Sequence, residues 1–123
     1  MLVLIVDDND KNRKLARDVL SAAGFQTLEA ASGAEGISLA AEHAPDVILM
    51  DLRLPDMDGT DAAQRLGAET RTASIPVVAL SALPLEDSGD WLQATGFAGW
   101  LEKPINIAQF ADHVRGYCAE AGM

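Results

Sequence analysis

The chain has 123 residues, of which 49% are hydrophobic and 23% are charged, a composition typical of a globular domain with a substantial core. Its formal net charge of −10 excludes the basic surfaces that nucleic acids and anionic membranes select. A lone cysteine, Cys118, and the lack of any long apolar run predict a cytoplasmic protein with no internal disulfide, no signal peptide and no membrane span.

Apolar runs and helical patterns alternate along the chain. The apolar runs predict strands at Leu2–Val6, Phe25–Glu29, Val47–Met50, Pro76–Leu80 and Phe97–Leu101. Each run is followed by a helical pattern. The first helix is capped by Asn9 or Asp10, the second by Ser32 with Glu35 at capping-box spacing, and the last by Asn106 with Gln109. Weaker helices are expected in between, one to about Leu66 and one over Leu85–Thr95. Strand–helix units joined by short links predict one α/β domain over residues 1–123, a doubly wound, five-stranded parallel sheet with helices on both faces.

The spacing of apolar residues predicts which face of each helix is buried. In the first helix, which ends at Gly24, these residues are Leu15, Val19 and Ala22 or Ala23. In the second helix, which stops before Pro45, they are Ala34, Ile37 and Ala41. In the last helix they are Ile107, Phe110, Ala111, Val114, Tyr117 and Cys118.

Carboxylates follow two of the predicted strands. Asp7 and Asp8 end the first strand, and Asp51 ends the third. Open α/β sheets place their sites at the carboxyl edge, and in the common strand order 2-1-3-4-5 the first and third strands are neighbours. Three gathered carboxylates repel one another unless positive charge joins them, and a divalent cation with a lysine provides it. Lys103, at the end of the fifth strand, is the candidate lysine.

The chain resembles the receiver domain of two-component response regulators over its whole length. The motifs that carry this resemblance, in the family's order and spacing, are Val6-Asp7-Asp8-Asn9, Leu49-Met50-Asp51-Leu52, Leu54-Pro55-Asp56-Met57-Asp58-Gly59, Leu80-Ser81-Ala82 and Glu102-Lys103-Pro104. The resemblance implies the flavodoxin-like or CheY-like fold with strand order 2-1-3-4-5. No room remains for an output domain, so we expect a stand-alone regulator of the CheY and DivK type.

The resemblance also implies a site. Asp51 is then a phosphoacceptor that takes a phosphoryl group from the phosphohistidine of a histidine kinase or histidine phosphotransfer protein, and the chain is not an enzyme beyond its own phosphorylation and dephosphorylation. Mg²⁺ is bound by Asp8, Asp51 and the backbone carbonyl of Arg53, with Asp7 acting through water. Lys103 reaches the phosphoryl oxygens as a mobile point charge.

Signalling in the family comes from coupling between two further positions. Ser81 moves toward the phosphoryl group, and an aromatic residue on the fifth strand, here Trp100, turns into the space that Ser81 leaves. The family more often has Tyr or Phe there, and Arg53 is a second departure that we expect to tune phosphate lifetime. The Lys103–Pro104 peptide bond is a candidate for the cis form.

The implied partners are proteins. The kinase or a downstream protein target docks on the site-side loops and the first helix, or on the face made by the fourth helix, fifth strand and last helix. We expect a monomer or weak dimer that binds neither nucleic acid nor membrane.

Two other interpretations compete with the receiver. Asp56-Met57-Asp58-Gly59-Thr60 matches the D-x-D-G-T signature of haloacid-dehalogenase-like phosphatases, with Asp56 as the nucleophile. In that family the signature directly follows an apolar strand, whereas here it follows a loop that begins after Asp51. A binding module that no longer switches through phosphate is the other alternative, and Trp100 is its support.

Overall fold

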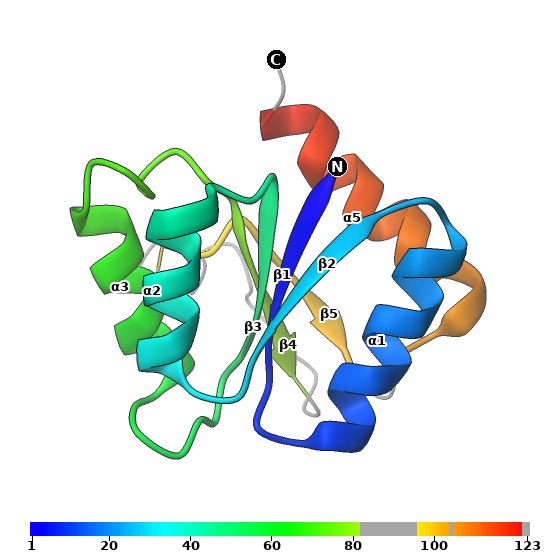
Figure 1. Ribbon diagram of the computed structural model, residues 1–123, viewed down its shortest axis with the longest axis horizontal. Coiled ribbons are helices and arrows are strands. Elements are labelled where there is room, and N and C mark those ends of the chain that lie inside the picture. The colour runs from blue at the N-terminus through cyan, green and yellow to red at the C-terminus, as the bar shows by residue number, and fades with distance from the viewer. Residues whose placement is uncertain (82–95, 104, 122–123) are drawn as a thin grey trace.

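The protein is described by a computed structural model over residues 1–81, 96–103 and 105–121. Its strands are β1 (Leu2–Val6), β2 (Gln26–Ala30), β3 (Val47–Asp51), β4 (Val77–Ser81) and β5 (Gly99–Glu102), and its helices are α1 (Asp10–Ala22), α2 (Gly33–His43), α3 (Gly59–Ala68) and α5 (Ile107–Ala121). The five strands form one sheet in the order β2-β1-β3-β4-β5, and every neighbouring pair is parallel (Figure 1). The predicted doubly wound α/β sheet is therefore confirmed, while the helix expected over 85–95 lies outside the described residues.

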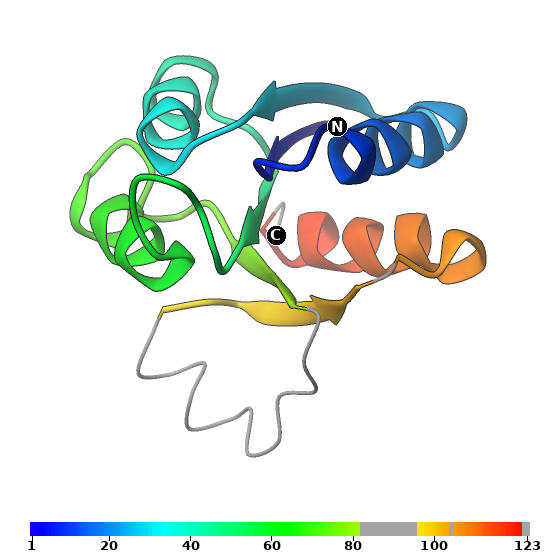
Figure 2. The same cartoon turned by 90° about the horizontal axis from the view of Figure 1, so that it is seen from below.

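Helices cover both faces of the sheet. Seen from below, α1 and α5 lie on one side of the strands, and α2 and α3 lie on the other (Figure 2). Because successive side chains of a strand point to opposite faces, the continuous apolar runs supply two cores. Strand residues of the α1 and α5 core include Val3, Ile5, Val47, Leu49, Val78 and Leu80. Those of the α2 and α3 core include Leu4, Val6, Ile48, Met50, Val77 and Ala79.

The same alternation decides where the ends of the strands point. Asp7 and Asp51 continue the rows of β1 and β3 that face α1 and α5, and Lys103 continues the corresponding row of β5 through Leu101. Val6 pairs with Met50 in the register, so Asp7 and Asp51 follow at the same level. The strand pattern alone thus brings two acids and a lysine together at one edge.

The caps largely follow the predictions. Asn9, rather than Asp10, caps α1, since its side-chain oxygen accepts hydrogen bonds from the N–H groups of Lys11 and Asn12 at 3.0 and 3.1 Å. Ser32 Oγ accepts from the N–H of Glu35 at 3.2 Å. The Glu35 carboxylate accepts from the N–H of Ala31 at 2.9 Å, which is one residue before the partner that a capping box predicts.

The predicted buried faces of the helices are correct in part, since Val19, Ile37, Ala111 and Tyr117 pack half-buried against the two cores. Other residues differ from the prediction. In α1 the buried residues are Ala16 and Leu20, and Leu15 is 36% exposed. In α2 they are Gly33, Gly36 and Ala40. In α5 Phe110, Val114 and Cys118 are buried as predicted, but Ile107 is 63% exposed. Small residues face the sheet in α2 because this helix lies close to the strands; a Cβ on Gly36 would approach Val6 Cγ2 to 2.7 Å. No helix within the described ranges has the length and apolar character that a membrane span requires.

Gly59, the first residue of α3, lies directly against the end of β3. A Cβ at this position would overlap the Asp51 carbonyl oxygen and come within 2.8 Å of Leu52 Cα. Backbone atoms cannot yield as a flexible side chain can, so a methyl group here must displace the helix or the strand end.

We therefore expect Gly59→Ala to destabilise the protein by about 1–3 kcal/mol, the usual cost of overpacking, when unfolding is followed by circular dichroism. Gly67→Ala is the matched control in the same helix, since its Cβ would meet no atom within 4 Å. Replacing a helical glycine in open space should stabilise by about 0.5–1 kcal/mol. Equal effects of the two substitutions would contradict the close approach of α3 to Asp51.

Candidate functional site

Three carboxylates meet at the carboxyl edge of the sheet. Asp7, Asp8 and Asp51 each offer an oxygen, and these oxygens all lie within 4.8 Å of one another. Asp7 and Asp51 are buried, with 1% and 9% of their surfaces exposed, whereas Asp8 is exposed. The residues open into a cleft of about 530 Å³ lined by Asp7, Asp8, Asn9, Asn12, Asp51, Leu52, Arg53, Leu80, Ser81 and Lys103.

Lys103 joins the two buried acids. Its Nζ lies 3.1 Å from Asp7 Oδ2 and 3.2 Å from Asp51 Oδ2. Each carboxylate uses its other oxygen locally: Asp7 Oδ1 accepts from the N–H of Asn9 at 2.9 Å, and Asp51 Oδ1 accepts from the N–H of Arg53 at 3.2 Å. These two-residue turns fix the carboxylate planes, so one oxygen of each acid is directed at the same ammonium group.

The environment of Asp51 does not favour its charge. Burial raises the pKa of the Asp51 carboxyl, and the negative charge of Asp7 raises it further. The N–H of Arg53 and the ammonium of Lys103 act in the opposite direction without reversing the shift. The cluster is therefore short of positive charge, and a cation would stabilise its ionised form.

The donor set fits Mg²⁺. Hard carboxylate oxygens surround one point, and the exposed Asp8 leaves that point open to solvent. Magnesium keeps several of its waters and takes only one or two carboxylates, so an open cleft suits it better than a closed cage. Arg53, whose carbonyl was the predicted third ligand, lines the same cleft.

Ser81 and Trp100 occupy different parts of this region. Ser81 is buried at the end of β4 and lines the cleft, and its carbonyl accepts from the N–H of Lys103 at 2.7 Å. Trp100 is half-buried on β5, packs against the α2 and α3 core and does not line the cleft. Trp100 pairs with Ala79, two residues before Ser81, so both side chains belong to the same face of the sheet. The predicted cis bond involves Pro104, which lies outside the described residues.

Asn12, on the first turn of α1, is a cleft residue that the sequence analysis missed. It stands four residues after Asp8, which is one helical turn. Because α1 begins just after the acid pair, this spacing could have indicated that Asn12 lies beside the acids.

Asp56 lies outside the cleft and has another role. Its two carboxylate oxygens accept hydrogen bonds from the N–H groups of Gly33 and Ala34, each at 2.9 Å. These bonds lower the pKa of the Asp56 carboxyl. Asp56 therefore caps α2 from the loop that follows β3. This structural role explains the aspartate of the phosphatase-like signature, so Asp56 need not be a nucleophile.

This fold and this site define a receiver domain. The family model described as the response regulator receiver domain matches residues 3–115, and the chain belongs to that family, whose members act as signalling switches in two-component systems.

Relatives and solved structures agree with the assignment. The polar-differentiation response regulator DivK of Brucella ovis is 35% identical over 119 residues, which cover 97% of both chains. The chemotaxis protein CheY4 of Vibrio cholerae has a TM-score of 0.87 at 27% identity, with 94% of this chain and 97% of that one covered. The receiver domain of the sensor histidine kinase PA1611 from Pseudomonas aeruginosa has a TM-score of 0.86 at 27% identity, covering 96% and 97%; it was solved with magnesium coordinated in its active-site cleft.

The raised pKa of Asp51 predicts a gain in stability when its charge is removed. Such a group stabilises the fold in its protonated form, and this contribution is lost as pH rises through the folded-state pKa. Asp51→Asn should therefore unfold at a higher temperature than the wild type at pH 7 in metal-free buffer. The difference should shrink as the pH falls below the ordinary carboxyl range. A lower melting temperature for Asp51→Asn at pH 7 would contradict this account of the site.

Proposed function

We propose that Asp51 is the phosphoacceptor of a phosphorelay, and that the phosphoryl group comes from a phosphohistidine on a histidine kinase or histidine phosphotransfer protein. The observation that carries this proposal is the single ammonium of Lys103 placed between Asp7 and Asp51, at 3.1 and 3.2 Å, inside an open cleft. A lysine fixed between two acids, within reach of solvent, is available to a third anion.

The transfer is a displacement at phosphorus. An oxygen of the Asp51 carboxylate forms the new P–O bond, the P–N bond to the donor imidazole breaks, and its electron pair remains on the imidazole nitrogen. Such reactions depend on positioning and charge neutralisation more than on acid–base chemistry. Lys103 then exchanges its contact with Asp51 Oδ2 for a phosphoryl oxygen, and the hydroxyl of Ser81 donates to another.

Asp8, Asp51 and the carbonyl of Arg53 would hold Mg²⁺ directly, and Asp7 would act through water. The ion supplies positive charge beside the transferring group. Clustering of the three carboxylates supports this assignment, as does the magnesium described in the cleft of the related Pseudomonas domain. Arg53 is exposed at the rim of the cleft, where its side chain can shield the phosphoryl group and so tune its lifetime.

The output is a conformational change read by a downstream protein. Ser81 moves toward the phosphoryl group, and Trp100, on the same face of the sheet, responds to the space that is left. The half-buried position of Trp100 supports this role, since a fully packed indole would have no room to reorient. The buried, unpaired Cys118 suits a reducing compartment such as the cytoplasm, and we expect a monomer or weak dimer.

The proposal predicts one phosphoryl adduct. Phosphoramidate, which carries the same P–N bond as phosphohistidine, should label the wild type in the presence of Mg²⁺ when intact mass is measured. Asp51→Asn should remain at background. Lys103→Ala should label about 10²-fold more slowly, the usual loss for one electrostatic stabiliser.

Asp56→Asn is the control for the phosphatase-like signature. It should label at the wild-type rate, because Asp56 binds the N-terminus of α2 and not the cleft. Labelling that persists in Asp51→Asn and disappears in Asp56→Asn would overturn the proposal.

A further inference from the structure

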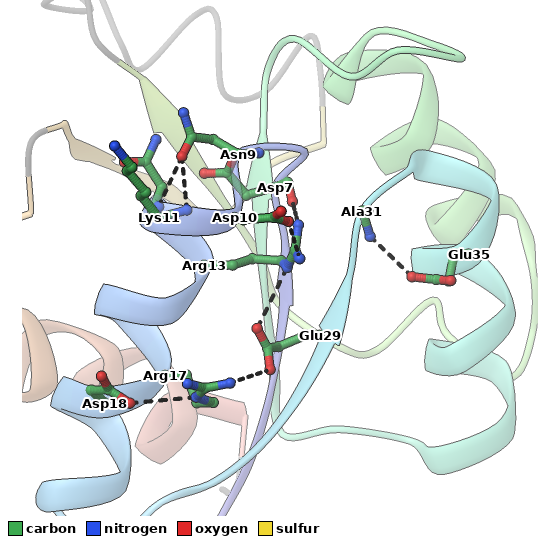
Figure 3. A network of polar contacts seen from close by, with 11 residues as sticks. Asp7, Asn9, Asp10, Lys11, Arg13, Arg17, Asp18, Glu29, Ala31 and Glu35 are labelled. Atoms are coloured by element: carbon green, nitrogen blue, oxygen red, sulfur yellow. Dashed lines mark hydrogen bonds and ion pairs between the residues drawn. The ribbon is translucent and has the colours of Figure 1, made fainter.

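Arg13, on the first turn of α1, connects the acid end of β1 with β2 (Figure 3). Its Nη1 donates a hydrogen bond of 2.8 Å to the backbone carbonyl of Asp7. Its Nε lies 3.4 Å from Glu29 Oε1, and its Nη2 binds Asp10. The side chain is 16% exposed, so the guanidinium lies mostly beneath the surface, directly behind the acid pair.

The carbonyl that Arg13 holds belongs to the peptide between Asp7 and Asp8. That peptide is planar, so fixing its oxygen also fixes the direction in which the chain leaves β1 toward Asp8. On the other side, the N–H of Asp7 donates to the Ala30 carbonyl at 3.0 Å. The backbone around Asp7 is thus held by β2 on one side and by Arg13 on the other.

Asp8 has no comparable support of its own. It is exposed, and within the described part of the chain its carboxylate has no hydrogen bond or ion pair. Its place among the three clustered carboxylates therefore depends on the backbone that carries it. Two side-chain contacts restrain the backbone at Asp8: the turn in which Asp7 Oδ1 accepts from the N–H of Asn9, and the hydrogen bond from Arg13 to the Asp7 carbonyl.

Arg13 is itself restrained by charge. Glu29 lies between two arginines, with Oε1 at 3.4 Å from Arg13 Nε and Oε2 at 3.2 Å from Arg17 Nη1. Within the described residues Arg13 Nε is buried without a hydrogen-bond partner, so its interaction with Glu29 is one of charge. The planar fork of arginine reaches Asp7, Asp10 and Glu29 together, which the single ammonium of a lysine cannot do.

We propose that Arg13 is a positioning residue for the cation site, which orients the Asp7–Asp8 peptide and so keeps the Asp8 carboxylate beside Asp51. The inference rests on the proposed function, because the cation to be bound is the Mg²⁺ of the phosphorylation site. Arg13 does not contact the ion or the phosphoryl group; it acts through the backbone.

Replacing Arg13 would change the affinity for Mg²⁺ in opposite directions through its charge and through its orienting contact. A positive charge near the cluster repels Mg²⁺, so its loss alone would tighten binding. Loss of orientation would weaken binding, typically by 10- to 100-fold for a residue that supports a metal ligand. Arg13→Lys keeps the positive charge but loses the planar guanidinium with its several N–H donors, whereas Arg13→Gln loses both the charge and the guanidinium. Arg17 offers matched controls, since it shares Glu29 and carries the same charge but does not contact Asp7.

The test is calorimetric titration of Mg²⁺ into the full chain and four variants, after thermal unfolding has established which are folded. Arg13→Lys and Arg13→Gln should each raise the Kd about 10-fold, while Arg17→Lys and Arg17→Gln leave it unchanged. In nitrogen-15 NMR spectra without Mg²⁺, the Asp8 amide should shift in the Arg13 variants and stay in place in the Arg17 variants.

Each outcome decides between the two proposals. Wild-type affinity in Arg13→Lys, or tighter binding in Arg13→Gln, would overturn the positioning role while leaving the phosphorylation site intact. If one Arg13 variant does not fold, the other decides the question by itself. A wild type that binds no Mg²⁺ would instead contradict the proposed function.

Discussion

Lys103 forms ion pairs with both Asp7 and Asp51, and the geometry of the site follows from this shared ammonium group. Buried carboxylates repel each other and lose their hydration, and an unpaired one would tend to take up a proton. Lys103, with Nζ at 3.1 and 3.2 Å from the two acids, offsets that repulsion without removing it, since the pKa of Asp51 remains raised. The cleft is thus stable enough to form and still favours further positive charge, as the proposed phosphoryl acceptor requires.

The parallel sheet produces this arrangement from simple geometry. Side chains alternate along a strand, so Asp7, Asp51 and Lys103 extend rows whose earlier members are core residues. Short turns then orient each carboxylate through the N–H two residues later. Gly59 lets α3 begin against the Asp51 carbonyl, and Arg13 holds the Asp7 carbonyl. The site is therefore built as much from backbone contacts as from its own side chains.

Much of this was predictable because it depends on local pattern. Apolar runs that end in Asp7 and Asp51 identify buried strands and their site edge, and Asn9 and Ser32 identify helix starts. Tertiary packing accounts for what the pattern missed. Gly36 faces the core because α2 lies close to Val6 of β1, and Gly33 is buried against Met57; an apolar stripe reveals neither. Asp56 bonds to a helix start 22 residues earlier. The loop before Asp56 spoke against a phosphatase nucleophile, but no local signal predicted a cap at so long a sequence separation.

We propose that Asp51, Asp8 and Lys103 together form one site for an anion and a cation at the carboxyl edge of the sheet. A crystal structure of the chain with Mg²⁺ and beryllofluoride would show whether both ligands bind there. We expect beryllofluoride bonded to a carboxylate oxygen of Asp51, a fluorine within reach of Lys103 Nζ, and Mg²⁺ beside Asp8. Beryllofluoride bonded to Asp56, or an intact Lys103–Asp51 ion pair with no ligand in the cleft under saturating conditions, would contradict it.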